Sequence, residues 1–143
     1  MKHDKNEAYI ITCDNVYMKL DVYDNYMNIY NYNVKYINIP EGIENVIMVG
    51  INFNGELVLP STVHSLQCQK NKINKIILPL GMKYLDCQFN NLTELKLPFG
   101  LTNLYCRGNK IKELDIPTTL LKGNFDKSVK GLEKITHLSI NLF

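Results

Sequence analysis

LQCQKN at residues 66–71, LDCQFN at 85–90 and LYCRGN at 104–109 are three copies of one motif, spaced 19 residues apart. Each copy places a cysteine two residues after its leucine and an asparagine three residues after the cysteine. Each copy is also followed by a proline at the same offset, at Pro79, Pro98 and Pro117. A fixed period near 20 residues is typical of a solenoid, in which every repeat forms one coil stacked on the previous one.

The repeat extends beyond these three copies. The prolines continue backward at Pro60 and Pro40, with spacings of 19 and 20 residues. Past the last proline the motif decays, because Gly123 and Phe125 stand where leucine and cysteine are expected. The end coils of a solenoid must cover apolar surface that has no further neighbour. We therefore predict a single domain over residues 1–143, with an N-terminal cap at 1–25, about five repeats at 26–120 and a C-terminal cap at 121–143.

One coil can be read from residues 63–81. Residues 66–69 alternate apolar and polar, which predicts a half-buried strand. Asn71 then turns the chain, and we expect its amide to bond backbone groups of its own and the next coil. Residues 73–79 are too few and too apolar for an ordinary helix, and Pro79 favours extended geometry before it. The sequence thus predicts a β-rich solenoid with a parallel β-sheet on the concave side, an extended, polyproline-like convex side and little or no helix except near the C-terminus.

The two ends leave more than one arrangement open. Residues 9–23 are predicted to form a hairpin that closes the first coil, because an open sheet edge invites unwanted pairing. Residues 129–138 fit a short helix with Ser128 as its N-cap, whereas 135–143 alternatively fit a strand. An exposed apolar C-terminal segment would favour an end-to-end dimer through Ile140, Leu142 and Phe143.

The repeated cysteines, Cys68, Cys87 and Cys106, are predicted to be buried, reduced thiols. Their spacing lacks the close ligand pairs of structural zinc sites, and no histidine recurs beside them. In other coils Met48 and Ile29 fill the same position, which marks it as a hydrophobic core position. Parallel side chains stacked along a sheet seldom aim correctly for a disulfide. We therefore expect no metal site, no disulfide and a cytoplasmic setting.

Composition and motifs indicate binding rather than chemistry. The formal net charge of +2 gives no reason to expect a nucleic-acid partner. The polar start MKHDKNE predicts no export signal, and no apolar run approaches the length that spans a membrane. No nucleophile motif, glycine-rich phosphate loop or histidine-based metal motif is present. We predict no enzyme activity, no catalytic residues, no cofactor and no membrane partner.

The outward face of the predicted sheet carries more aromatic residues than a solvated face needs. Tyrosine and arginine are enriched at binding hot spots, because they offer a large area with few torsions to freeze. Ladders of aromatic residues also stabilise sheets without any partner, so a purely structural role stays open. The candidate partner-binding residues on the concave face are Tyr26, Tyr30, Ile47, Val49, Gln67, Gln69, Tyr84, Asp86, Gln88, Phe89, Tyr105 and Arg107.

The repeat resembles the leucine-rich repeat superfamily. MKYLDCQFN at 82–90 and LTNLYCRGN at 101–109 match its strand consensus. The short Leu-Pro period resembles the compact repeats of some bacterial effectors. With cysteine in the strand, it is also similar to leucine-rich repeat families of insect poxviruses and giant DNA viruses, and the Asn-, Lys-, Ile- and Tyr-heavy composition without tryptophan fits these viral families. This resemblance implies a non-catalytic module that binds a protein, in the viral case a host protein in the cytoplasm.

Two other roles compete with this interpretation. One is a structural, self-assembling repeat module that forms a homodimer through its edge strands or C-terminal segment. The other is a substrate-recognition arm for a separate ligase. The sequence leaves the oligomeric state open between a monomer and a weak homodimer.

Overall fold

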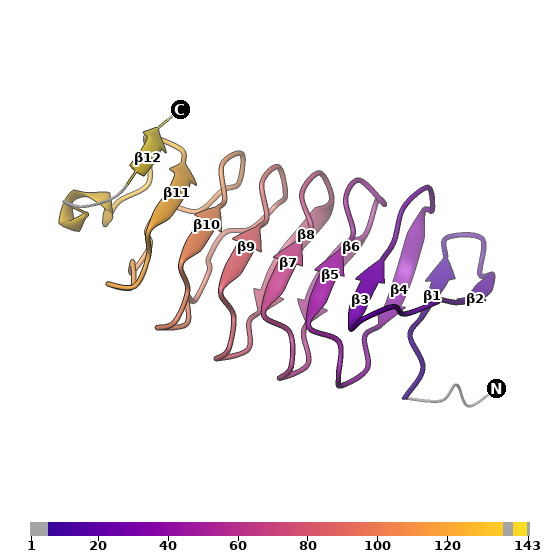
Figure 1. The fold of residues 1–143 in the computed structure, drawn as a ribbon. Helices are drawn as coiled ribbons and strands as arrows, with labels where there is room; N and C mark the ends of the chain where they lie inside the picture. The colour runs from indigo at the N-terminus through magenta and orange to yellow at the C-terminus, as the bar shows by residue number, and fades with distance from the viewer. Residues whose placement is uncertain (1–5, 136–138, 143) are drawn as a thin grey trace.

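A computed structural model of the protein describes residues 6–135 and 139–142. The chain winds into a β-solenoid whose front is one all-parallel, seven-stranded sheet (Figure 1). This confirms the fold class predicted from the repeat. From the N-terminal to the C-terminal end, the strands of the sheet are β3 (Tyr26–Asn28), β5 (Asn45–Ile47), β7 (Ser65–Gln67), β9 (Tyr84–Asp86), β10 (Asn103–Tyr105), β11 (Lys122–Phe125) and β12 (Ser139–Leu142).

Parallel pairing in a constant register places equivalent residues of successive coils side by side. Leu66 of β7 pairs with Val46 of β5 and Leu85 of β9, and Leu85 pairs with Leu104 of β10. These four residues form an interior column, and each is at most 1% exposed. A slip of one residue would turn the whole column to solvent, so burial fixes the register.

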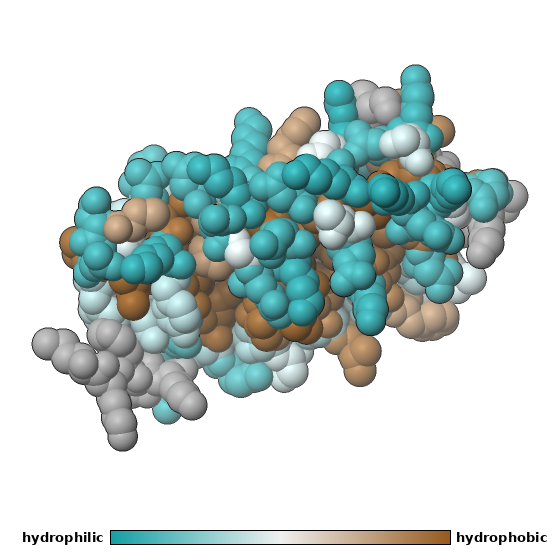
Figure 2. All heavy atoms as spheres, turned by 180° about the vertical axis from the view of Figure 1, so that it is seen from behind, coloured by the Kyte–Doolittle hydropathy of each residue, from teal (hydrophilic) through white to brown (hydrophobic). Residues whose placement is uncertain are grey.

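The back of the solenoid is less regular than the front. It carries β4 (Val34–Asn38), β6 (Asn54–Val58) and β8 (Lys72–Ile77). β6 and β8 form a two-stranded parallel sheet, whereas the following coils cross the back mainly as extended chain. Figure 2 shows this face, on which bands of polar residues alternate with apolar surface.

The asparagine column connects neighbouring coils. The Asn71 Nδ2 donates to the Met48 carbonyl at 2.7 Å and to the Cys68 carbonyl at 3.0 Å, and its Oδ1 accepts from the amides of Ile51 and Phe53. The amide thus bonds its own coil, as expected, but its second partner is the preceding coil and not the predicted next coil.

The N-terminal hairpin is confirmed, and it joins the back of the molecule. β1 (Tyr9–Thr12) pairs antiparallel with β2 (Tyr17–Lys19) on one side and with β4 on the other. Ile10 in the middle of β1 is fully buried. The hairpin therefore covers the end of the apolar core by extending the back of the first coil.

The C-terminal segment continues the front sheet beyond the last clear repeat. β11 follows β10 in register, with Gly123 opposite Leu104. A single turn of 3-10 helix, η1 (Leu132–Lys134), precedes β12, and its N-cap is Gly131 in a left-handed conformation instead of the predicted Ser128. Residues 139–142 form a strand, which is the alternative predicted for 135–143. Residues 136–138, which both predictions included, and residue 143, which the strand prediction included, lie outside the described residues.

The repeated thiols occupy the core, as predicted. Cys68, Cys87 and Cys106 are free cysteines and are at most 2% exposed. Burial raises the pKa of all three thiols, and the nearby carboxylate of Asp86 adds to the effect. The thiols therefore stay protonated and act as small apolar side chains.

Candidate functional site

The front face is defined here as the side of the seven-stranded sheet that points away from the interior. Side chains alternate across a strand, so β9 directs Leu85 inward and directs Tyr84 and Asp86 to the front face. β10 lies beside it in register and contributes Tyr105. All the candidate residues on strands follow this alternation.

Tyr84 and Tyr105 form an aromatic pair at the centre of this face. Their ring centroids lie 5.7 Å apart, and the rings are inclined by 42°. Both side chains are half-buried. Burial raises the pKa of Tyr84, and the Asp86 carboxylate and the Tyr105 hydroxyl raise it further. The Tyr84 phenol therefore stays neutral, and the two packed rings form an aromatic surface on the front face.

Asp86 lies on this face by register, but its side chain is only 8% exposed. Its Oδ1 accepts from the backbone amide of Gln88 at 3.2 Å and from the Gln88 Nε2 at 3.1 Å. Gln88 in turn accepts from the side chain of Asn124 at 3.3 Å. Asp86 therefore orients Gln88 just after β9, and little of its carboxylate is exposed to a partner.

Phe89 and Arg107 form a second contact at the rim of the front face. Phe89 adopts a φ of 55°, although left-handed backbone is unfavourable for a bulky residue. Its ring is 47% exposed and lies under the guanidinium of Arg107, with Cζ 5.9 Å from the ring centroid. A Cβ on Gly108 would lie 2.5 Å from the Phe89 ring, so only glycine fits beside it. We call Tyr84, Tyr105, Phe89 and Arg107 the aromatic–arginine cluster.

The remaining candidates do not join this cluster. Tyr26 and Tyr30 belong to the first coil, and β5 and β7 separate β3 from β9. Strands spaced about 4.8 Å apart put the two groups roughly 14 Å from each other. The predicted face is thus divided into two aromatic regions with half-buried side chains between them, namely Ile47, Val49, Gln67 and Gln69.

Sequence reasoning missed a row of exposed apolar residues on the proline turns. Leu80 and Phe99 directly follow Pro79 and Pro98, and they are 89% and 75% exposed. Leu121, near the next turn, is also exposed. The signal that could have found them is their position, because the residue between the repeat proline and the following glycine lies at the tip of a turn.

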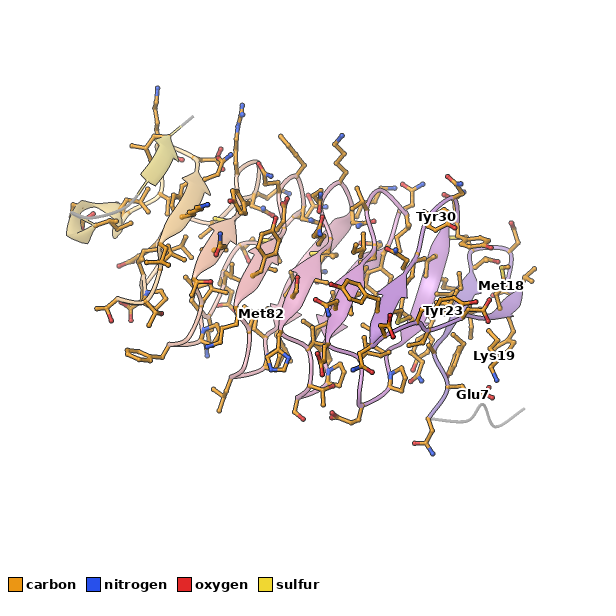
Figure 3. All side chains as sticks on the ribbon, viewed as in Figure 1. Glu7, Met18, Lys19, Tyr23, Tyr30 and Met82 are labelled. Carbon is orange, nitrogen blue, oxygen red and sulfur yellow. The ribbon has the colours of Figure 1, made fainter. Side chains whose placement is uncertain are left out.

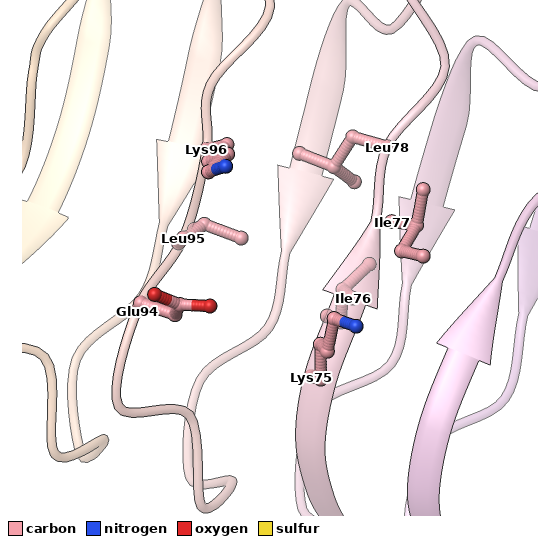
Figure 4. A pocket seen from close by; sticks show the side chains of 7 residues that line it. All are labelled: Lys75, Ile76, Ile77, Leu78, Glu94, Leu95 and Lys96. Carbon is pink, nitrogen blue, oxygen red and sulfur yellow. The ribbon is translucent and has the colours of Figure 1, made fainter.

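A hollow also opens on the back, where the strand ladder stops. It measures about 370 Å³ and lies between β8 and the extended residues 94–96 (Figure 4). Lys75 at its border is paired with Glu56 at 3.2 Å. Apolar and charged side chains share its lining, which is Lys75, Ile76, Ile77, Leu78, Glu94, Leu95 and Lys96. No candidate residue of the front face reaches it.

Within residues 6–135 and 139–142, no three His, Cys, Asp or Glu side chains gather closely enough to hold a metal ion. No helix in the same part of the chain has the length and apolar character needed to cross a membrane.

Comparison of the chain with protein-family models, curated proteins and solved structures gave no match. We therefore infer a role for the protein from the geometry of the front face.

Proposed function

We propose that the protein is a non-catalytic binding module that engages another protein through the front face, with the aromatic–arginine cluster as its anchor. The observation that carries this proposal is the exposed ring of Phe89 held against the guanidinium of Arg107, beside the packed Tyr84–Tyr105 pair. A bulky residue in left-handed backbone costs about 1–2 kcal/mol, and glycine would avoid that cost. Lys70 has the same left-handed conformation at the equivalent position of the preceding coil, so this backbone turn belongs to the repeat. At Phe89 the turn holds an exposed aromatic ring beneath an arginine; aromatic residues and arginine are enriched at protein interfaces, and arginine is a hot-spot residue type.

The surroundings of the cluster support a protein ligand. Tyr84 and Tyr105 are already packed on each other, so little side-chain freedom is lost when a partner covers them. The resemblance of the repeat to leucine-rich repeats, including the viral families, supports the same role by analogy and suggests a host protein. Three buried reduced thiols fit a reducing compartment such as the cytoplasm.

Site-specific crosslinking tests the proposal. Tyr105 is replaced by the photo-reactive residue p-benzoylphenylalanine, and Val58 on the back, which is more exposed to solvent than Tyr105, is replaced in a control variant. We expect irradiation in cell extract to join one defined protein to the position 105 variant and not to the position 58 variant. Equal crosslinking at both positions, or none, would contradict the proposal. A crosslink to a second copy of the chain would instead favour the self-assembling role.

A second variant separates binding from folding. Phe89→Gly should keep or raise the stability of the fold, because glycine adopts left-handed backbone without strain. The same change should lower capture of the crosslinked partner about tenfold, as loss of a hot-spot residue does. Circular dichroism and urea unfolding check the first expectation, and the crosslink yield checks the second.

A further inference from the structure

A hollow of about 370 Å³ opens at the N-terminal end of the solenoid, away from the aromatic–arginine cluster. One wall is the end of β2 and the loop after it, which contribute Lys19, Asp21 and Tyr23. The other wall is the first coil, which contributes Asn28, Tyr30 and Tyr32. Figure 3 labels Tyr23, Tyr30, Lys19 and Glu7 at this end of the molecule.

Three tyrosine side chains meet at this hollow. Tyr23 and Tyr30 are 73% and 66% exposed, and Tyr32 is half-buried. Elsewhere tyrosines pack on each other, as Tyr9 does with Tyr17 at 5.1 Å. Among the described residues no ring contact joins the three tyrosines of the hollow. Tyr32 packs against the hydrophobic core, so it is the faces of Tyr23 and Tyr30, which carry the negative part of the ring quadrupole, that are left for a ligand.

The charges around the hollow favour a cation. The carboxylate of Asp21 lines it, and the one ammonium group in its lining, that of Lys19, is bound to the Glu7 Oε1 at 2.7 Å. Residues 1–32 contain five acids and three lysines, which gives this end a formal side-chain charge of −2, although the whole chain carries +2. A negative end raises the local concentration of positive ligands.

The backbone adds one polar position to the wall. The amide of Ile29 donates to the carbonyl of Ile47 on β5 at 2.8 Å. Neighbouring residues of a strand point their N–H and C=O groups to opposite sides. Those of Asn28 therefore point away from β5, toward the open edge of β3 and the hollow. A hydroxyl or amide attached to the cation could bond there.

We propose that this hollow binds a quaternary alkylammonium group, such as trimethylammonium, between the tyrosine faces and the Asp21 carboxylate. Aromatic rings around an acidic group suit a large, weakly hydrated cation. A hard metal ion requires several oxygen ligands at once, and the hollow offers a single carboxylate. This site lies outside the front-face cluster, so it does not depend on the proposed function.

Choline and its neutral carbon isostere, 3,3-dimethyl-1-butanol, provide a matched pair of probes. Each is titrated into the ¹⁵N- and ¹³C-labelled full-length protein at constant ionic strength, and shifts are followed by NMR. We expect choline to shift the ring signals of Tyr23, Tyr30 and Tyr32 in a saturable manner. The isostere, which has the same shape without the charge, should leave these signals in place at the same concentrations.

Variants assign the effect to the rings and the carboxylate. Tyr30→Leu and Asp21→Asn should each weaken choline binding about two- to fivefold, whereas Tyr30→Phe, which keeps the ring, should not. Tyr105→Leu in the front-face cluster should bind choline as the unaltered protein does. Equal shifts with both probes, saturable shifts centred elsewhere, no shift at tens of millimolar choline, or an effect of Tyr30→Phe equal to that of Tyr30→Leu would overturn the proposal.

Discussion

At the scale of single residues, the asparagine column satisfies the backbone where the coils turn. Asn90 repeats the bonds of Asn71, donating to the carbonyls of Cys68 at 3.0 Å and Cys87 at 3.1 Å and accepting from the amide of Ile73 at 3.0 Å. These bonds need a donor and an acceptor on one short side chain. Aspartate supplies only acceptors and leucine supplies neither, so the position requires an amide.

Removing one amide should therefore be costly. Asn90→Ala leaves buried carbonyl and amide groups of two coils without partners, and we expect a loss of about 2–4 kcal/mol in the free energy of unfolding. Asn74→Ala, at an exposed position on β8, is the matched control and should change it by less than about 0.5 kcal/mol. Urea unfolding of both variants measures the difference. Equal effects would show that the column does not contribute to stability.

The buried thiols make stability depend on pH in the alkaline range. Burial raises the pKa of Cys106 from 9.0 to about 12 in the folded protein. The unfolded chain therefore releases this proton at a lower pH than the folded protein does. The contribution of the protonated thiol to the free energy of unfolding is fully present below pH 9 and is lost as the pH rises toward 12. We expect up to about 1.4 kcal/mol lost per pH unit for each such thiol. Urea unfolding between pH 8 and 10.5 should show a shallower decline for Cys106→Ala; an identical decline would contradict the argument.

At the scale of elements, β11 shows how a strand can depart from the motif and still fit. It carries Gly123 and Phe125 where the preceding strands carry leucine and cysteine. A Cβ on Gly123 would lie 2.1 Å from the Phe125 ring, and Phe125 is fully buried. The phenylalanine thus fills both positions, and glycine makes room for it.

This compensation predicts strong coupling between the two positions. Gly123→Leu alone should cost about 1–3 kcal/mol through overpacking, and Phe125→Cys alone about 3–4 kcal/mol through the cavity that it leaves. The double variant restores the motif of the preceding strands and should recover most of both losses. A double-mutant cycle measured by urea unfolding gives the coupling energy, expected to be at least about 2 kcal/mol. Additive losses would mean that the two side chains do not share one space.

At the scale of the whole molecule, the periodic residues were sufficient to predict the fold. A spacing of 19 residues places Leu66 and Leu85 opposite each other, because burial permits only one register. The pairing of β1 with β4 was not readable, since no periodicity connects residues 9–12 with 34–38. The continuation of the sheet into β11 was hidden for the same reason, because the exchange at Gly123 and Phe125 depends on packing between two side chains.

The candidate site was predictable only in part. Alternation along the strands correctly placed Tyr84 and Tyr105 on one face, and their pairing follows from the register. Burial of Asp86 depends on the side chains around it, which the alternation does not specify. The hollow beside Tyr23 could not be foreseen, because the loop after β2 lies outside the repeat and its path is set by the hairpin.

Stacked coils contact only their neighbours, so loss of one end should act locally. Removing residues 121–143 exposes Leu104 and takes away the Asn124 carbonyl that accepts from the Cys106 amide at 3.0 Å. We expect the Cys106 amide to lose most of its protection against hydrogen exchange. The Met48 amide, which lies three coils from Cys106 and donates to the carbonyl of Gln67 at 2.8 Å, should keep its protection in the same molecule. Exchange followed by NMR distinguishes this local fraying from a uniform loss across the chain, which would mean that the solenoid unfolds as one cooperative unit.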